Sequence, residues 1–224
     1  MPTLARRITR NEFSESQKEG LYRAIYERRD IRKEFLPRAI SKEVILKLLN
    51  AAHHAGSVGF MQPWNFIVIN DLAVKQNIKR IFEEENIKAS SNYEGDRKEK
   101  YLSMKLEGIL ESPVNVCVTC DPSRNGPHVL GRNTIFETDL FSTCCAIQNL
   151  WLAARAEGIG MGWVSILDLA KVSEALHIPA AVRIVAYLCL GYIDRFPEIP
   201  MLEEEGWQSR LPLETLVSWN RWQD

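Results

Sequence analysis

The sequence predicts one α+β domain. Four short apolar runs of strand length alternate with segments whose apolar residues recur at helical spacing, and no repeat interrupts them. The chain has 224 residues, 46% of them hydrophobic, so it can bury roughly 70% of its unfolded surface in one core. Residues 135–157 form a helix that is apolar on nearly every side, which requires burial within the domain or against a second subunit. We therefore expect a single domain, 1–224, that assembles as an intertwined homodimer.

The N-terminal part predicts two helices and then a strand. Residues 14–17 have the form of a capping box, and apolar positions continue this helix to an arginine cluster at 28–32. Ser41 begins a second helix that ends near Gly56. After a glycine-containing loop, residues 64–69 form the first strand.

Residues 71–111 are strongly charged and allow two interpretations. Helical pieces joined by a mobile connection would fit this composition, and such a segment could act as a lid. The alternative is a solvated helical hairpin, and the sequence alone favours the hairpin.

The second half alternates strands with helices and ends in an irregular tail. We expect strands at 114–119, 160–166 and 183–190, and helices at 135–157 and 168–176. From residue 191 the tail is too apolar for disorder and too irregular for a domain, so we expect it to wrap over a neighbouring subunit.

Composition excludes several classes of protein. A net charge of −1 without a basic stripe argues against nucleic acid as the main partner. No signal peptide or membrane-spanning run is visible, so we expect a cytoplasmic protein with no membrane partner.

The five cysteines do not form a disulfide framework. Cys117 and Cys120 lie in a predicted strand and point to opposite faces, so they cannot share a metal. Cys144 and Cys145 are expected to be small core residues. No histidine has zinc-ligand spacing, so we expect no metal.

The cluster at 28–32 places three arginines around Asp30. Guanidinium groups bind phosphate bidentately, and their charge favours an ionised carboxylate. A charge run of this kind is more often simply solvated, so the cluster alone does not define a site. Ser165 does not match a nucleophile elbow, and no dinucleotide or P-loop motif is present.

Three runs carry a resemblance to a known family. Residues 28–32, 59–65 and 158–168 are similar to the nitroreductase superfamily of FMN proteins. Within it the same runs resemble the 5,6-dimethylbenzimidazole synthase family, over about residues 19–216. The resemblance implies a central mixed or antiparallel sheet flanked by helices, and a homodimer.

The implied activity consumes the flavin. In this family reduced FMN and O2 yield 5,6-dimethylbenzimidazole and D-erythrose 4-phosphate, and the benzimidazole becomes the lower ligand of cobalamin. A separate flavin reductase would supply the reduced FMN. The resemblance assigns Asp30 and Ser165 as the functional pair. Our hypothesis is that Asp30 is the base that takes protons as the ribityl carbon is oxidised, and that Ser165 holds the flavin edge or the peroxide adduct by hydrogen bonding.

The resemblance also implies a set of flavin-binding residues. Arg97 and Leu106 would reach the flavin from the segment 71–111, which would then be a lid that excludes water and a nicotinamide. Arg210 would add a phosphate contact from the C-terminal extension, 191–224. The full implied set is Arg28, Arg29, Asp30, Ile31, Arg32, His53, Gln62, Arg97, Leu106, Ser165 and Arg210.

Other functions remain open on the same residues. The first is an NAD(P)H-dependent FMN nitroreductase or flavin reductase, which would retain its flavin. The second is a non-catalytic flavin-binding protein, which would return FMN intact. In a third alternative the arginines only bridge subunits.

Overall fold

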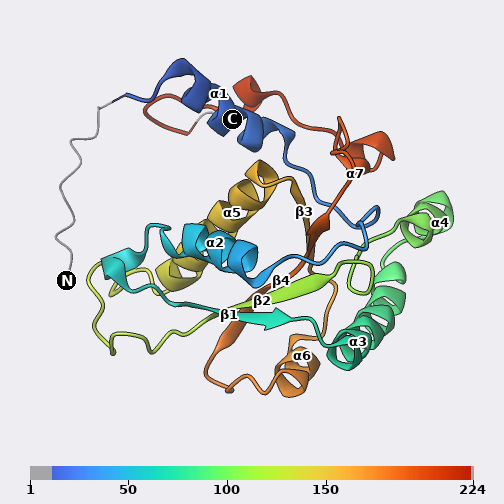
Figure 1. Cartoon of the computed structure of the whole chain (residues 1–224), viewed down its shortest axis with the longest axis horizontal. Coiled ribbons are helices and arrows are strands. Elements are labelled where there is room, and N and C mark those ends of the chain that lie inside the picture. The colour runs from blue at the N-terminus through green and yellow to red at the C-terminus, as the bar shows by residue number, and fades with distance from the viewer. Residues whose placement is uncertain (1–11, 223–224) are drawn as a thin grey trace.

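The computed structural model describes residues 12–222 and confirms an α+β fold built around an antiparallel sheet (Figure 1). Within those residues the sheet has four strands in the order β1-β2-β4-β3, and each neighbouring pair runs antiparallel. The strands are β1 (Trp64–Ile69), β2 (Val114–Cys120), β3 (Ile159–Val164) and β4 (Arg183–Tyr192). Because β2 and β4 are the inner strands, β1 and β3 form the two edges of the sheet.

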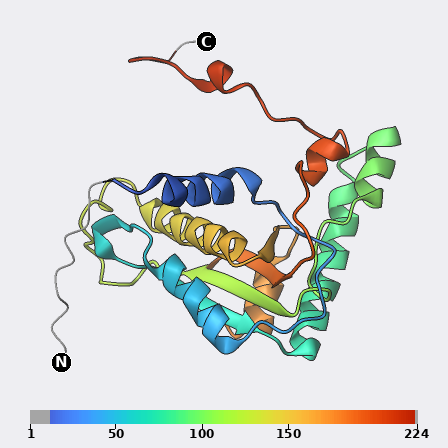
Figure 2. The same ribbon diagram turned by 45° about the horizontal axis from the view of Figure 1, so that its top comes forward.

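One face of the sheet is covered by α2 (Lys42–His53) and α5 (Thr138–Ala156), whose apolar residues form one core with the strands. On the outer side of this layer, α1 (Glu15–Glu27) packs against α5 (Figure 2). The predicted starts of α1 and α2 are confirmed. Ser14 and Gln17 form the capping box of α1, and the side chain of Ser41 accepts a hydrogen bond at the start of α2.

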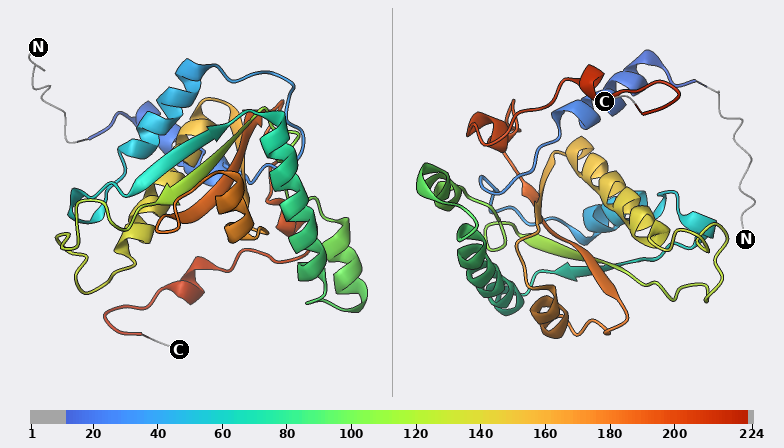
Figure 3. Two further views of the ribbon diagram at one scale, coloured as in Figure 1. Left: turned by 90° about the horizontal axis from the view of Figure 1, so that it is seen from below. Right: turned by 180° about the vertical axis from the view of Figure 1, so that it is seen from behind.

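The opposite face of the sheet is covered by α3 (Leu72–Ser90) and α6 (Leu169–Ala175) (Figure 3). Ile78, Ile81 and Phe82 of α3 are buried in this second core. Since each is almost completely withdrawn from water, α3 is fixed to the sheet by apolar burial.

The segment 71–111 therefore divides into two parts. The expectation of a solvated hairpin is wrong for α3, which is a core helix. The shorter α4 (Gly95–Ser103) buries only Tyr101 and extends beyond the sheet (Figure 1). Within 71–111, only α4 and its connections thus lack the burial that fixes α3 to the sheet.

The long apolar helix is shorter and less covered than the sequence predicts. It begins at Thr138 rather than 135, and Phe136 is 62% exposed in the preceding turn. Phe141, Cys144 and Cys145 also face outward, so the prediction that both cysteines are core residues is wrong for the single chain. One side of α5 packs on the sheet and α1 packs against another, while the side that carries Phe141, Cys144 and Cys145 stays exposed and is called here the open side of α5.

The two cysteines of β2 point to opposite faces of the sheet, as predicted. Cys117 lies in the core of α3 and α6, whereas Cys120 faces the opposite layer beside Thr143 of α5. Burial raises the pKa of the Cys117 thiol to about 12. Among residues 12–222 no group of three His, Cys, Asp or Glu side chains is arranged to hold a metal ion. Over the same range, the helices are too short or too polar to cross a bilayer.

The C-terminal segment leaves the body of the molecule. After β4, the chain forms α7 (Met201–Glu204) and a 3-10 turn, η2 (Leu213–Leu216), and then runs clear of the other elements (Figure 2). Every residue from 208 to 222 is exposed. Because this stretch includes several large apolar side chains, it has the composition of a segment that covers another surface.

Candidate active site

The arginine cluster lies along the free edge of β3. Asp30 forms a parallel bridge with Met161, and the backbone amide of Ile31 donates to the carbonyl of Met161 at 3.0 Å. The chain just after α1 thereby extends the sheet beyond its edge strand. This pairing fixes the backbone of the cluster relative to β3.

Two glycines allow this close approach. A Cβ at Gly160 would lie 3.0 Å from the side chain of Ile31. At Gly162 a Cβ would overlap the carbonyl oxygen of Ile31 and lie 3.2 Å from Oδ1 of Asp30. Because any side chain larger than hydrogen would push the cluster away, glycine is required at position 162. Alternating glycines on a strand are a sequence signal for such an approach, and sequence reasoning did not use it.

The carboxylate of Asp30 is held at both oxygens. Oδ1 accepts a hydrogen bond from the backbone amide of Trp163 at 3.0 Å, and Oδ2 lies 2.5 Å from the guanidinium of Arg32. The side chain is 31% exposed, so it remains accessible. Each carboxylate oxygen keeps a further lone pair, which leaves Asp30 able to accept a proton from a bound molecule.

The three arginines point in different directions. Arg28 lies over the ring of Trp151 at 4.7 Å. Arg29 donates to the backbone carbonyls of Tyr26, at 2.8 Å, and of Glu198. Arg32 is therefore the arginine that contacts Asp30 directly.

These arginines still suit an anionic group. The Nε atoms of Arg29 and Arg32 are buried and have no hydrogen-bond partner within residues 12–222. Burial lowers the pKa of Arg28, the nearby charges of Arg29 and Arg210 lower it further, and Asp30 opposes this effect. An added phosphate would relieve this excess of positive charge, so the cluster fits the phosphate of a nucleotide such as FMN.

A cavity of about 460 Å³ opens beside this cluster. Its walls include Asp30 and Arg32 on one side and Phe196, Ile199 and Met201 of the C-terminal segment on the other. Arg32 donates to the sulfur of Met201 at 3.7 Å, so the tail and the cluster are in contact across the cavity.

The sequence predicts that Ser165 lies within a strand, 160–166. In the structure β3 ends at Val164, and Ser165 lies just past its end. Its side chain is exposed. It follows Trp163, whose amide donates to Asp30, by two residues, so Ser165 lies next to the strand end to which Asp30 is bonded.

His53 and Gln62 lie at the other edge of the sheet, near the start of β1. Nδ1 of His53 accepts a hydrogen bond from the indole of Trp64 at 3.1 Å. Gln62 adopts a left-handed backbone, with φ of 50°, and its amide donates to Ser57 at 3.0 Å. Because β1 and β3 are opposite edges and Asp30 pairs with the outer side of β3, four strand spacings of about 4.8 Å separate β1 from Asp30.

The remaining predicted residues lie on the α4 side and in the tail. The guanidinium of Arg97 lies 4.6 Å from the ring of Trp207. Leu106 packs on the core of α3 and α6, and Arg210 is exposed. One chain therefore gathers the segment 28–32 and Ser165, but it does not bring the full predicted set to one place.

Comparisons with known proteins identify the family. A sequence model described as the nitroreductase family matches residues 25–192. A relative from Rhodospirillum rubrum, named 5,6-dimethylbenzimidazole synthase, is 42% identical over 200 residues, which cover 89% of this chain and 94% of the relative. A second relative of that name, from Rhodobacter capsulatus, is 36% identical and covers 90% of this chain and 97% of its own length. The chain belongs to the nitroreductase family.

Solved structures of the nitroreductase family confirm the fold. An iodotyrosine deiodinase bound to FMN and 3-iodo-L-tyrosine superposes with a TM-score of 0.70 at 23% identity, covering 90% of this chain and all of that one. The family model spans the arginine cluster and the whole sheet. It stops at the end of β4, so α7 and the exposed tail lie outside it.

The sequence did not reveal the groups that hold the arginine cluster in place. The amide of Trp163 and the space beside Gly162 are backbone features, and no side-chain motif predicts them. The buried carboxylate of Glu107 was also missed, because an isolated glutamate in a charged stretch resembles a surface residue.

Proposed function

We propose that this protein cleaves reduced FMN with O2 to give 5,6-dimethylbenzimidazole and D-erythrose 4-phosphate, and so supplies the lower ligand of cobalamin. The observation that carries the proposal is the carboxylate of Asp30, which lies in the arginine cluster and is fixed at both oxygens, by Arg32 and by the amide of Trp163. The 42% and 36% identical relatives named for this activity support it.

Reduced FMN would supply both the electrons that reduce dioxygen and the carbon skeleton of the benzimidazole. Arg28, Arg29 and Arg32 would bind the phosphate and the ribityl chain. Asp30 would accept a proton at its free lone pairs, with the Trp163 amide and Arg32 holding it in orientation. Ser165 would donate a hydrogen bond to the flavin edge.

We also propose that the complete site requires two subunits. His53 and Gln62 lie at the β1 edge, whereas Asp30 lies at the β3 edge, so two copies of the chain would complete each other's sites. The open side of α5 and the exposed apolar tail would supply the interface of the homodimer. Arg210 would add a phosphate contact to the cluster of its own chain, where its charge already lowers the pKa of Arg28.

We propose that α4 is the moving part of the lid and brings Arg97 to the flavin, whereas Leu106 would contact the flavin from the fixed loop that follows α4. Closing this lid would exclude water and leave no room for a nicotinamide, so a separate flavin reductase would deliver reduced FMN. The alternatives, a nitroreductase that retains its flavin and a non-catalytic carrier, would each return FMN intact.

The deciding experiment supplies chemically reduced FMN without oxygen, admits oxygen, and analyses the products by liquid chromatography and mass spectrometry. We expect loss of flavin with formation of 5,6-dimethylbenzimidazole. Quantitative recovery of oxidised FMN would contradict the proposal, and turnover with added NADPH would then indicate a reductase.

The variant Asp30→Asn tests the proposed base. The amide keeps an oxygen that can accept from the Trp163 amide but cannot take a proton, so we expect benzimidazole formation to slow by roughly 10²–10⁴-fold. Asp194→Asn, which changes an exposed acid, is the matched control and should retain the activity. Unchanged benzimidazole formation by Asp30→Asn would exclude Asp30 as the base.

A further inference from the structure

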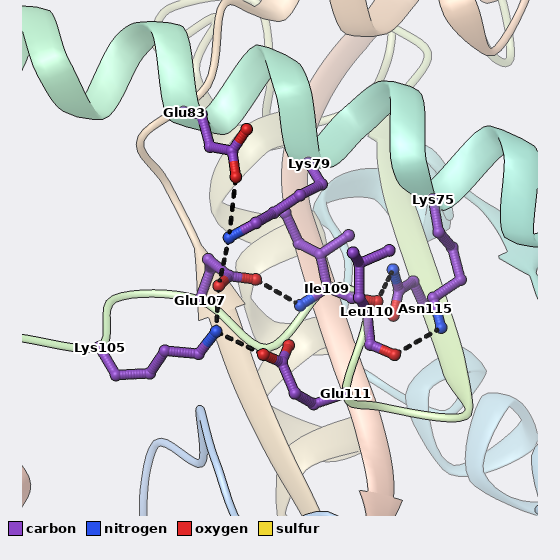
Figure 4. Close-up of polar contacts among 9 residues, drawn as sticks. All are labelled: Lys75, Lys79, Glu83, Lys105, Glu107, Ile109, Leu110, Glu111 and Asn115. Carbon is purple, nitrogen blue, oxygen red and sulfur yellow. Dashed lines mark hydrogen bonds and ion pairs between the residues drawn. The ribbon is translucent and has the colours of Figure 1, made fainter.

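A buried glutamate lies in the loop that joins α4 to β2. The side chain of Glu107 is only 1% exposed, although the surrounding sequence is highly charged. Figure 4 shows its carboxylate between Lys79 and Lys105. An ionised group is rarely buried unless positive charges and hydrogen bonds compensate for lost water.

Three donors compensate this carboxylate. Oε1 accepts from Lys79 of α3 at 2.8 Å and also from Lys105, and Oε2 accepts from the backbone amide of Ile109 at 2.7 Å. Burial acts to raise the pKa of Glu107, but the hydrogen bonds from Lys105, Lys79 and Ile109 outweigh it and lower the pKa. The side chain thus ties both ends of its own loop to α3.

Neighbouring polar groups fix the rest of the loop. Lys75 of α3 is buried and donates to the carbonyl of Ser112 at 2.5 Å. Asn115 of β2 donates to the carbonyl of Ile109 at 3.1 Å and to the hydroxyl of Tyr187 on β4 at 2.9 Å. The loop is therefore held by α3 and by the two inner strands.

This fixed loop contacts the arginine cluster. A Cβ at Gly108 would lie 2.9 Å from the carbonyl oxygen of Arg32 and 2.6 Å from the ring of Phe35. Leu106, on the other side of Glu107, packs into the core of α3 and α6. A displacement of Glu107 would move both the support of Arg32 and the position of Leu106.

We infer that Glu107 is a positioning residue for the flavin site. It anchors residues 104–112, so that Gly108 supports the backbone of Arg32 and Leu106 is presented to the flavin. This inference rests on the proposed function and deepens it, since it gives a role to a charged group that touches neither flavin nor oxygen.

The variant Glu107→Gln keeps the shape of the side chain and removes its charge. We expect FMN to bind at least tenfold more weakly, measured by the change in fluorescence of oxidised FMN on titration. At saturating reduced FMN, we also expect a smaller fraction of the flavin to become benzimidazole and a larger fraction to return as oxidised FMN. This partition reports geometry at the site and does not follow from stability alone.

Glu111→Gln is the matched control. Glu111 pairs with the same Lys105 at 2.5 Å, but it is exposed and does not bond the amide of Ile109. We expect wild-type affinity and partition from this variant. If Glu107→Gln does not fold, Lys105→Met, which removes one donor and leaves Lys79 and Ile109 in place, should weaken FMN binding by a smaller factor.

Two results separate this inference from the proposed function. A folded Glu107→Gln protein with a lower melting temperature but wild-type FMN affinity and partition would overturn the positioning role. If Glu107→Gln weakens FMN binding while the wild-type protein forms no benzimidazole, the positioning role stands and the proposed function fails.

Discussion

Asp30 accepts a hydrogen bond from a backbone amide that lies 133 residues further along the chain. The arginines around it are visible in the sequence, but this partner is not, because every residue except proline carries the same amide. The contact depends on β3 presenting Trp163 at the sheet edge and on Gly162 leaving room beside it. A carboxylate positioned in this way is sensitive to changes in the strand beside it.

Gly162→Ala tests that sensitivity. The added methyl group would overlap the backbone of Ile31, so we expect a loss of about 3 kcal/mol in unfolding free energy and a loss of FMN binding. Urea unfolding and FMN titration measure the two effects. Gly20→Ala is the control, because a Cβ there meets no atom within 4 Å and α1 should gain about 1 kcal/mol. Wild-type stability in Gly162→Ala would show that the cluster can move away from β3 without cost.

Ser165→Ala tests the second member of the predicted pair. Because the side chain is exposed, we expect stability to change by less than about 0.5 kcal/mol. Loss of one hydrogen bond worth about 1 kcal/mol should slow benzimidazole formation about fivefold. Product formation and thermal melting are the measurements, and an unchanged rate would remove Ser165 from the site.

At the scale of elements, the strands and the starts of α1 and α2 could be predicted, whereas the environment of each helix could not. Ser14 and Ser41 mark their helices because a side-chain oxygen satisfies a free amide within the same few residues. The burial of α3 depends on strands far along the sequence, which local composition does not reveal. Its many charged residues therefore led to the wrong prediction of a solvated helix. The burial of Glu107 could not be predicted for the same reason, whereas the cluster at 28–32 was evident from local composition.

The anchoring of α3 to residues 104–112 predicts a pH dependence. The folded-state pKa of Glu107 is below the ordinary value of 4.5, so in acid the unfolded chain binds more protons at this position than the folded chain. The stabilisation is complete above 4.5 and is lost as the pH falls through the lowered pKa. Glu107→Gln should flatten this acid limb when urea unfolding is followed from about pH 7 to about pH 3. Parallel curves for the variant and the wild type would contradict this assignment.

At the scale of the whole molecule, the predicted flavin residues divide between two edges of one sheet. A single chain also leaves large apolar side chains exposed on α5 and along the tail. Association of two chains would explain both features, because it would bring the two edges together and cover the apolar side chains. The homodimer expected from the sequence is therefore tied to the completeness of the site.

Phe141→Glu tests this association. Phe141 is 58% exposed on the open side of α5, and a charge there should oppose burial against a partner. We expect sedimentation to give twice the chain mass of 25.7 kDa for the wild type and the single mass for the variant, with loss of FMN binding. Leu169→Glu, on the exposed side of α6, should leave the mass unchanged. A wild-type protein that sediments as one chain would overturn the two-subunit site.

The strand order has a consequence for how the protein is made. β3 pairs only with β4 among the strands, and β4 ends at Tyr192. While the ribosome is still producing residues 183–192, β3 has no strand to pair with, and the arginine cluster has no finished edge to join. Flavin therefore has no complete pocket on a nascent chain, and a message truncated before β4 would yield a product that exposes β3 and is prone to aggregate.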